Sequence, residues 1–372
     1  SGSNSLAQGQ ELYDKSKAIM LDAGFDLRKW ETNHQELRAY ITSQEHCKFD
    51  TLPGADETTY SKITCNPTVE KTNNSMVLGL EWDTHTDEFV FLFEDLLGRC
   101  SAMEQTKRNL LSVSASIYDP LGLIAPITAR IKTIFQILCK DKLNSDEIIP
   151  SNIASVWNKF LDEIKRLREI RQQRCVFNLH LSSKFRIELH GFSDSSFELY
   201  CAVIYLRFIS DCGVTVSFLA SKTKVAPLKK LTIPRLELLG CLLLSRLIKE
   251  VLEGVNGRIE VDGMYCWSDS KVALCWIKGK EKSWKAWVEN RVVSIWSVVG
   301  RDRWHFVKGE VNPADVSTRI CYNLNECFDG CWFSGPSFLL SQHFESGGPG
   351  KTLVQMVLME IWLMRLMRKR LR

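Results

Sequence analysis

The sequence has no marked excess of charge of either sign. Lys and Arg number 48 against 44 Asp and Glu, a formal net charge of +4 over 372 residues. A broad electrostatic surface for nucleic acid cannot be inferred from this total, so such binding would need local basic patches. An apolar run of the about 20 residues that cross a bilayer is also missing. The most apolar stretch, 352–367, contains Glu360 and Arg365, and we expect no membrane span.

Cysteine spacing of the zinc-binding kind is missing as well. None of the 13 cysteines forms a Cys-x-x-Cys pair, the spacing typical of zinc ribbons and knuckles. A set made of Cys321, Cys327, Cys331 and His343 fits no common zinc finger. The odd number of cysteines, with no secretory signal at the start of the sequence, favours a reduced, intracellular protein.

Three common catalytic motifs are absent. The sequence contains neither the GxSxG of serine hydrolases nor the GxxxxGK[ST] loop that binds nucleotide phosphates. A retroviral-type aspartic protease needs Asp-Thr-Gly or Asp-Ser-Gly, so that two Asp can share one proton. The Asp-Ser pairs here are followed by Ser196 and Lys271. Proteolysis therefore has no catalytic Asp in the required context.

The composition is that of a globular protein, with 45% hydrophobic and 25% charged residues, and the length suits two or three domains. Residues 1–10 are small and polar and are expected to be disordered, and 42–75 to form a loop or linker. We expect a helix over 11–23 that ends at Gly24, then a short strand over 26–30. A hairpin and three helices are expected at 76–82 with 89–93, and at 107–116, 129–142 and 155–171.

The composition changes at about residue 180, where a different order of elements begins. Strands are expected at 185–192, 201–207, 215–220, 264–267 and 304–307. Helices are expected at 236–251, 270–277, 284–299 and 314–320. Three strands followed by alternating helices and strands predict an α/β fold, a mixed sheet covered by helices.

Four carboxylates occupy strand ends and helix starts in this second half: Asp194, Glu237, Asp269 and Asp315. Such positions bring side chains to one edge of a mixed sheet. Four carboxylates that converge there would repel one another unless divalent cations lay between them. Magnesium is the natural candidate, since it prefers oxygen ligands. The alternative is that each acid is a helix cap or a surface residue.

Several segments resemble a known family. HGFSDSS (190–196), TIPRLELLG (232–240), YCWSDSK (265–271) and NPADVSTR (312–319) are similar to the ribonuclease H domain of Pao/BEL retrotransposon polyproteins. AGFDLRKWETN (23–33), VLGLEWD (77–83) and the segment 106–132 resemble the region just upstream, where a reverse transcriptase ends. The resemblance covers about residues 10–340, a region also catalogued as Pao retrotransposon peptidase.

The resemblance implies a ribonuclease H-like, five-stranded mixed sheet flanked by helices, preceded by an α+β remnant of a reverse-transcriptase palm and thumb. The four acids named above would hold two Mg²⁺, with Mn²⁺ as a substitute, and the RNA strand of an RNA/DNA hybrid would be hydrolysed. Contacts to the 2′-hydroxyl would select RNA. The implied location is a cytoplasmic virus-like particle or the nucleus, and the rest of a reverse transcriptase is a possible partner.

The same resemblance divides the chain. Residues 1–10 would be a disordered start and 11–104 the end of the palm with a hairpin like a primer grip. Residues 105–178 would form thumb or connection helices, 179–322 the ribonuclease H-like domain and 323–372 a tail. The end of the tail is basic, and it is either an amphipathic helix at a surface or an accidental extension of the reading frame.

Two departures from the family pattern matter. Many ribonucleases H carry a His in a loop after a VKG-like strand, thought to help product release, and Glu310 of VKGE stands near that place. No YVDD-type or YMDD-type motif occurs, so the acid pair of a polymerase is absent. DNA synthesis by this chain alone is therefore not expected.

Basic residues near these acids are candidates for nucleic-acid contact through phosphates: Lys222, Lys224, Lys230, Arg235, Lys285 and Arg291. A solvated basic loop is an equal alternative for the first group. For the tryptophans beside Lys285 and Arg291, Trp284 and Trp287, plain core packing is favoured. The leading hypothesis is a ribonuclease H-type nuclease, and the alternative is a catalytically idle fragment that binds nucleic acid or acts as a scaffold.

Overall fold

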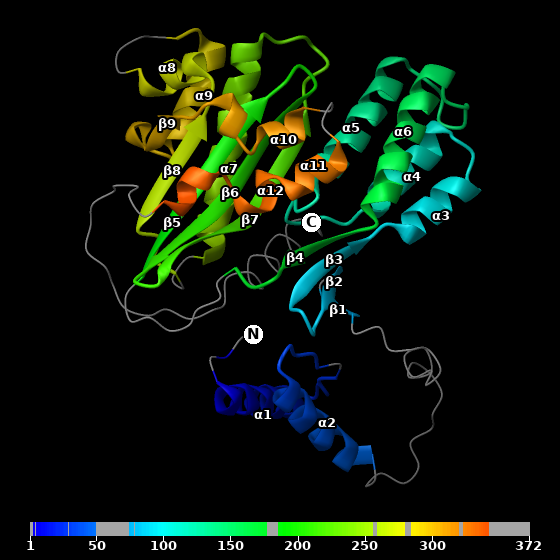
Figure 1. Ribbon diagram of the computed structural model, residues 1–372, viewed down its shortest axis with the longest axis vertical. Helices are drawn as coiled ribbons and strands as arrows, with labels where there is room; N and C mark the ends of the chain where they lie inside the picture. The colour runs from blue at the N-terminus through cyan, green and yellow to red at the C-terminus, as the bar shows by residue number, and fades with distance from the viewer. Residues whose placement is uncertain are drawn as a thin grey trace. The chain divides into compact units, whose positions relative to one another are not determined.

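The computed structural model describes residues 3, 5–28, 30–49, 74–77, 79–176, 185–255, 259–279, 284–319 and 323–341. These residues divide into two compact units, one within Ser1–Val90 and Gln173–Cys175 and the other within Phe91–Gln172 and Val176–Val354. Figure 1 shows the elements of each unit. Within the described residues, no helix has both the length and the apolar character needed to cross a bilayer.

The first unit begins with two helices, α1 (Leu6–Asp22) and α2 (Gln35–Phe49). We expected disorder up to residue 10, but the helix already begins at Leu6, because the Ser5 side chain caps it by accepting a hydrogen bond from the Gln8 amide at 3.3 Å. The buried Lys17 ammonium donates to Glu45 of α2 and to the Tyr13 hydroxyl. The two helices are thus joined by a polar contact as well as by apolar packing.

Two expectations for this unit were wrong. Residues 42–49 belong to α2 and not to a linker; residues 50–73 lie outside the described part. No strand forms over 26–28 and 30. Local hydrogen bonds dominate there, with the Trp30 indole donating to the Leu27 carbonyl at 3.2 Å. A single apolar alternation over five residues cannot form a strand without a neighbour to pair with.

The predicted hairpin is present as three short strands, β1 (Asn74–Val77), β2 (Leu80–Asp83) and β3 (Glu88–Leu92). They belong to a sheet of order β1-β2-β3-β4, in which β4 is Glu169–Gln173. Gly79, with φ of 85°, separates β1 from β2, a conformation that glycine adopts without strain. The interpretation of this region as the end of a reverse-transcriptase palm stays a prediction.

The second unit opens with four helices, α3 (Glu94–Ala102), α4 (Lys107–Ser116), α5 (Ala125–Lys140) and α6 (Ser151–Leu167). The last three were predicted near these places, but the helix expected over 155–171 ends at Leu167, because Glu169–Gln173 pairs as strand β4. Helix α5 begins earlier than expected because Pro126 lies in its first turn, where proline is tolerated. The apolar face of α6 is buried along Trp157, Phe160 and Ile164.

A five-stranded mixed sheet follows, in the order β7-β6-β5-β8-β9. Its strands are β5 (Phe185–Ser195), β6 (Leu199–Ser210), β7 (Gly213–Val225), β8 (Gly263–Ser268) and β9 (Trp304–Phe306). Strands β5, β6 and β7 pair antiparallel, whereas β8 pairs parallel to β5 and β9 parallel to β8. The predicted α/β fold, with a ribonuclease H-like mixed sheet, is confirmed.

Helices cover both faces of this sheet. On one face α7 (Ile233–Val255) packs on β5 and β6 and contacts α8 (Lys271–Lys278) and α9 (Ala286–Trp296). On the other face lie α10 (Asp315–Thr318), α11 (Leu324–Asp329), α12 (Cys331–Ser334) and the 3-10 turn η3 (Ser337–Leu340), seen in front of the sheet in Figure 1. The completely buried Arg207 of β6 holds η3 against the sheet by donating to the Leu339 and Ser341 carbonyls. It also donates to Glu188.

The edge strand β7 is covered by the loop before α5. The Ser221 amide donates to the Leu121 carbonyl at 2.8 Å and its hydroxyl to the Gly122 carbonyl at 2.5 Å. Gly122 has φ of 73°, and a Cβ there would lie 2.2 Å from the Ser221 carbonyl oxygen, so no other residue fits. The Trp332 indole donates to the Leu123 carbonyl at 2.7 Å. The segment 105–178, expected to form thumb or connection helices apart from the ribonuclease H-like domain, thus contacts the five-stranded sheet directly.

Candidate metal centre

Asp194 lies near the end of β5, where it pairs with Cys201 of β6. Its side chain is only 5% exposed. It faces the side of the sheet that carries α10, and the Thr318 hydroxyl of α10 donates to its Oδ2. A buried carboxylate at a strand end, close to a hydroxyl donor, is held in one orientation.

Glu237 reaches the same place from α7, on the opposite face of the sheet. The helix approaches β5 closely because it has a glycine at the crossing: a Cβ on Gly240 would lie 3.2 Å from the Asp194 carbonyl oxygen. The Ser195 hydroxyl donates to the Leu236 carbonyl at 2.9 Å and fastens the helix there. Glu237 itself is 7% exposed, so α7 delivers a carboxylate into the protein and not to its surface.

Asp269 follows β8 directly. The alternative reading as a helix cap does not apply to it, because the cap of α8 is Ser270, whose hydroxyl accepts from the Ala273 amide. The loop after β9 lies against Asp269: a Cβ on Gly309 would be 3.0 Å from its Oδ2. This is the VKGE loop, and its Glu310 is exposed.

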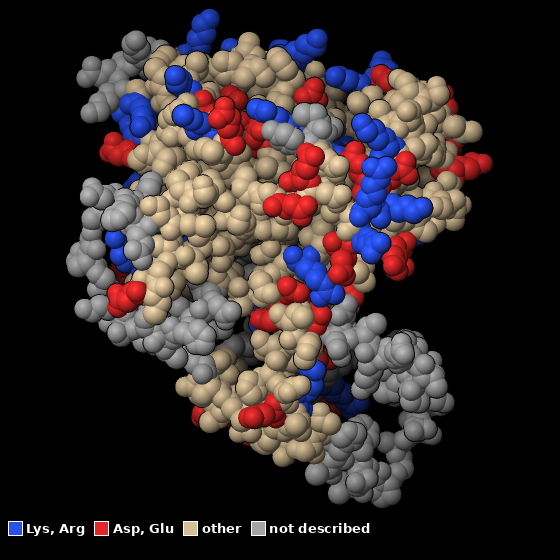
Figure 2. All heavy atoms as spheres, in the orientation of Figure 1, with Lys and Arg blue, Asp and Glu red and all other residues tan. Residues whose placement is uncertain are grey.

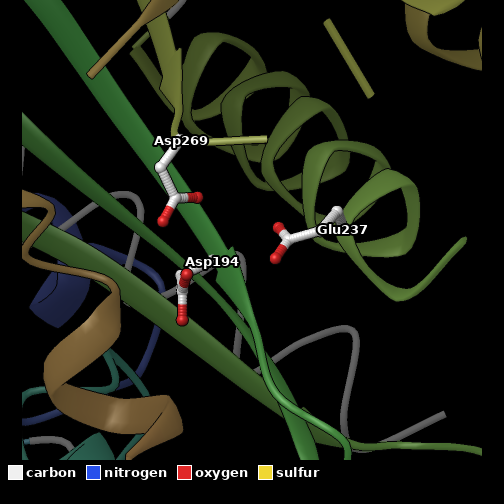
Figure 3. Close-up of side chains that lie close together, drawn as sticks. All are labelled: Asp194, Glu237 and Asp269. Carbon is white, nitrogen blue, oxygen red and sulfur yellow. The ribbon is translucent and has the colours of Figure 1, made fainter. Parts of the chain in front are cut away.

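The three carboxylates converge. One oxygen from each of Asp194, Glu237 and Asp269 lies within 4.8 Å of the other two, and Figure 3 shows the three side chains pointing into one space. Two oxygens, Glu237 Oε2 and Asp269 Oδ1, are buried and have no hydrogen-bond partner among the described residues. Buried acceptors without a donor are unfavourable, so this group of atoms lacks a positive ligand.

Burial is the main reason why the pKa of Glu237 is raised to about 9 and that of Asp194 to about 7. The charges of the neighbouring Asp269 and Asp315 raise both further. The pKa of Asp269 is raised as well, again chiefly by burial. The three groups therefore resist ionising together near neutral pH unless a cation compensates their charge.

Asp315, the fourth predicted acid, lies beside this group but is not a member of it. It is the first residue of α10 and is mostly buried. Its Oδ1 accepts from the Arg319 guanidinium at 2.6 Å. Neither Thr318 nor Arg319 was singled out in the sequence, although both follow Asp315 at the helical spacings of three and four within NPADVSTR.

The predicted basic contact residues differ in their surroundings. Lys224, Lys230 and Lys285 are exposed. Lys222 is instead engaged in an ion pair with Glu250 of α7 at 3.3 Å. Figure 2 shows basic and acidic side chains interspersed over the face it presents, in keeping with the small net charge. Binding of a polyanion such as nucleic acid would therefore depend on local clusters of basic side chains.

One such local group combines cations with an aromatic ring on α7 and α9. The guanidinium carbons of Arg235 and Arg291 lie 5.1 and 3.6 Å from the ring centroid of Trp287. Trp287 is half-buried, whereas Val288 and Ile295 on the same helix are buried. The core packing expected for Trp284 and Trp287 is thus incomplete, because both are only half-buried and Trp287 stacks with two arginines.

The cysteine-histidine set is partly outside the described residues, which exclude Cys321 and His343. Its two remaining members lie in or at different short helices, Cys327 in α11 and Cys331 in α12. Burial raises the pKa of the Cys327 thiol to about 11.

Solved structures with likeness to the chain include two ribonucleases H1. That of the halophilic archaeon Halobacterium salinarum NRC-1 is 14% identical, with 39% of this chain and 98% of that chain covered and a TM-score of 0.24. LC11-RNase H1 in complex with an RNA/DNA hybrid is 14% identical, with 39% and 97% covered and a TM-score of 0.26. A foamy viral protease-reverse transcriptase in complex with double-stranded DNA is 13% identical, with 63% of this chain but 37% of that chain covered, at a TM-score of 0.38.

No curated protein matches the chain. A family model does match it, the Pao retrotransposon-like RNaseH-like domain, over residues 106–270. The match begins at the helices that cover β7 and includes Asp194, Glu237 and Asp269. Over residues 106–270 the chain is thus similar to this domain, and the match confirms the resemblance to Pao retrotransposons for this segment.

Proposed function

We propose that this protein is a magnesium-dependent endonuclease that hydrolyses the RNA strand of RNA/DNA hybrids, as one section of a Pao/BEL retrotransposon polyprotein. The observation that carries the proposal is the convergence of Asp194, Glu237 and Asp269, from two strand ends and a helix, within 4.8 Å. The family match supplies the RNaseH-like context for these residues.

The donor set suits Mg²⁺. All three side chains offer oxygen, the ligand type that this hard cation prefers. Two of their buried oxygens have no hydrogen-bond donor among the described residues, and a bound cation would satisfy both. Mn²⁺, which accepts the same ligands, would be a substitute.

When bound there, Mg²⁺ would supply an activated water and charge neutralisation at the scissile phosphate. The protein's part is to hold Asp194, Glu237 and Asp269 in place before substrate arrives. The close approach of α7 at Gly240, the Ser195–Leu236 hydrogen bond and the Thr318–Asp194 hydrogen bond all serve this purpose. Asp315 would join as the fourth acid.

Substrate binding would use the arginine pair that stacks on Trp287. Arg235 lies in the first turn of α7, the helix that also carries Glu237, and phosphates held by Arg235 and Arg291 would be bound at this end of the helix. The exposed Lys224, Lys230 and Lys285 would contribute further salt-dependent contacts. Contacts to the 2′-hydroxyl would favour the RNA strand.

The proposal implies a cellular setting. An RNA/DNA hybrid arises during reverse transcription, so the chain would work inside the cell, in a cytoplasmic virus-like particle or in the nucleus. The rest of a reverse transcriptase would be its partner and would supply the polymerase acids that this chain lacks.

The direct test is cleavage of an end-labelled RNA/DNA hybrid by the purified chain, with Mg²⁺ or with chelator. We expect RNA fragments only with Mg²⁺, and none from Asp269→Asn. A matched control is Asp302→Asn, which neutralises an exposed acid of the same unit and should cleave like the wild type. A well-folded wild type that binds Mg²⁺ and hybrid but leaves the RNA intact would reject the nuclease in favour of an idle binding fragment.

A further inference from the structure

Two donors, Thr318 at the end of α10 and Arg319 directly after it, contact Asp194 of the triad and Asp315 beside the triad. The Thr318 hydroxyl donates to Asp194 Oδ2, and the Arg319 guanidinium to Asp315 Oδ1 at 2.6 Å. The four residues span only one turn of helix and the strand end next to it. The side of Asp194 that faces α10 is therefore already supplied with donors.

On the opposite side of Asp194, hydrogen-bond donors are missing. There Glu237 Oε2 and Asp269 Oδ1 are buried without a donor among the described residues. One cation placed within the triad would satisfy both atoms. A cation between Asp194 and Asp315 would instead have to displace the two donors Thr318 and Arg319.

We propose that Thr318 and Arg319 keep the Asp315 side closed to a second cation, so that the chain alone binds one divalent ion, at the triad. A guanidinium and a divalent cation compete for the same carboxylate oxygens, and the ion pair must open before Asp315 can become a ligand. This inference rests on the proposed function and specifies how its metal site is regulated.

The Arg319 side chain can separate from Asp315 when nucleic acid binds. Its side chain is 52% exposed, while that of Asp315 is 10% exposed, so the arginine can move into solvent whereas the acid stays in place. A phosphate of the incoming nucleic acid is a bidentate partner for a guanidinium. Substrate would therefore release Asp315, and the second ion would bind only together with substrate. Arg319 acts through Asp315 and is a positioning residue.

The test counts ions bound to the full chain without nucleic acid, by calorimetric titration with Mn²⁺. We expect one ion for the wild type and two for Arg319→Met, with Thr318→Val increasing the affinity of the second ion. Arg319→Lys keeps a cation at Asp315 and should return the number to one. Arg108→Met removes an arginine from an exposed ion pair with Asp146 and should leave one ion bound.

Electron paramagnetic resonance locates the added ion. Two Mn²⁺ that share Asp194 couple magnetically, whereas an ion bound elsewhere on the surface does not. Two coupled ions in Arg319→Met, against an isolated one in the wild type, would support the proposal. Loss of the single wild-type ion in Asp269→Asn would support its placement at the triad.

Two results would overturn it and are separable from failure of the nuclease. Two ions in the wild type, or one ion in both the wild type and a folded Arg319→Met, would reject the closed side while leaving the nuclease proposal intact. A folded wild type that binds no ion would reject the metal-dependent nuclease, and this inference with it. Circular dichroism of each variant verifies folding, and Thr318→Val, which is nearly isosteric, provides a second variant.

Discussion

Gly240 of α7 lies so close to Asp194 of β5 that a Cβ on the glycine would be 3.2 Å from the aspartate's carbonyl oxygen and 3.0 Å from Ser195 Oγ. A helix and a strand that approach at this distance hold Glu237 and Asp194 on the two sides of one small space. The glycine is thus required for the convergence of the Asp194 and Glu237 carboxylates, although it has no side chain to contribute.

The first prediction concerns this contact. Gly240→Ala should shift α7 by a few tenths of an ångström and destabilise the fold by about 1–3 kcal/mol, the usual range for overpacking. It should also weaken binding of Mn²⁺, since Glu237 moves with the helix. Thermal unfolding and calorimetry measure both. Gly98→Ala is the control, because Gly98 lies in α3 with open space around it, and there alanine should stabilise the helix. Unchanged metal affinity in Gly240→Ala would contradict the positioning role.

The second prediction concerns repulsion within the triad. With chelator present at pH 7, Glu237→Gln should stabilise the protein by up to about 3 kcal/mol, because folding of the wild type must protonate a carboxyl well above its ordinary pKa. The same variant should gain less stability than the wild type from added Mg²⁺. Melting temperatures with and without Mg²⁺ provide the measurement, and Glu310→Gln, at an exposed acid, is the control.

The sign of the pH effect follows from the same residues. The pKa of Glu237 in the fold, about 9, is above its ordinary value of 4.5, so the folded state binds more protons than the unfolded chain between these values. Without metal, the wild type should lose stability as pH rises from about 5 to about 9. Glu237→Gln should reduce this slope. An equal slope in the variant would contradict the burial and repulsion argued for the triad.

A third prediction uses Asp119, away from the metal site. Its carboxylate accepts from the Leu123 and Ile124 amides at 2.8 and 3.0 Å. Burial is the main cause that raises its pKa from 3.8 to about 6. Folding should therefore be favoured by up to about 3 kcal/mol more at pH 4 than at pH 7 through this group. Asp119→Asn should lower that difference, measured by urea unfolding at saturating Mg²⁺; a difference equal to the wild type's would refute it.

The fourth prediction concerns the boundary expected at residue 179. A chain that begins there lacks the loop that pairs with Ser221 and the Leu123 carbonyl that accepts from Trp332. We expect residues 105–372 to fold and 179–372 to aggregate or to melt at a clearly lower temperature. Size-exclusion chromatography and circular dichroism of the two fragments decide this. Equal stability of the two fragments would show that the helices before residue 179 are not needed for the domain to fold.

The fifth prediction concerns hybrid binding. Arg291→Met should weaken binding of an RNA/DNA hybrid in Ca²⁺ and reduce the slope of log K against log salt by about 1, the change expected for one phosphate contact. Lys222→Met should have a smaller effect, because Lys222 is engaged with Glu250. Fluorescence anisotropy over a series of salt concentrations measures both. Equal slopes for the two variants would argue against Arg235, Arg291 and Trp287 as the surface that contacts the hybrid.

The sequence predicted the order of strands and the converging acids well, for a physical reason. Asp194 and Asp269 each follow an apolar run that forms a buried strand, so their place at the sheet edge depends on the local pattern alone.

What could not be predicted depends on contacts distant in sequence. The ion pair of Arg319 with Asp315 and the hydrogen bond from Thr318 to Asp194 arise only when α10 meets β5. Trp287 has the spacing of a core residue, but its surroundings include Arg235 of another helix. The strand expected over 26–30 does not form, and among the described residues no strand lies paired beside this segment.

The loop before α5 that covers the edge strand β7 has a consequence for how the chain folds during synthesis. A ribosome produces the N-terminal part of a chain first, so the Leu121–Gly122 segment exists before Ser221 is synthesised. When β7 emerges, the carbonyls that pair with Ser221 are already available. An unpaired edge strand can pair with a neighbouring chain, and nascent chains on one messenger are near neighbours. The order of segments in this chain therefore shortens the time during which β7 could pair with the wrong molecule.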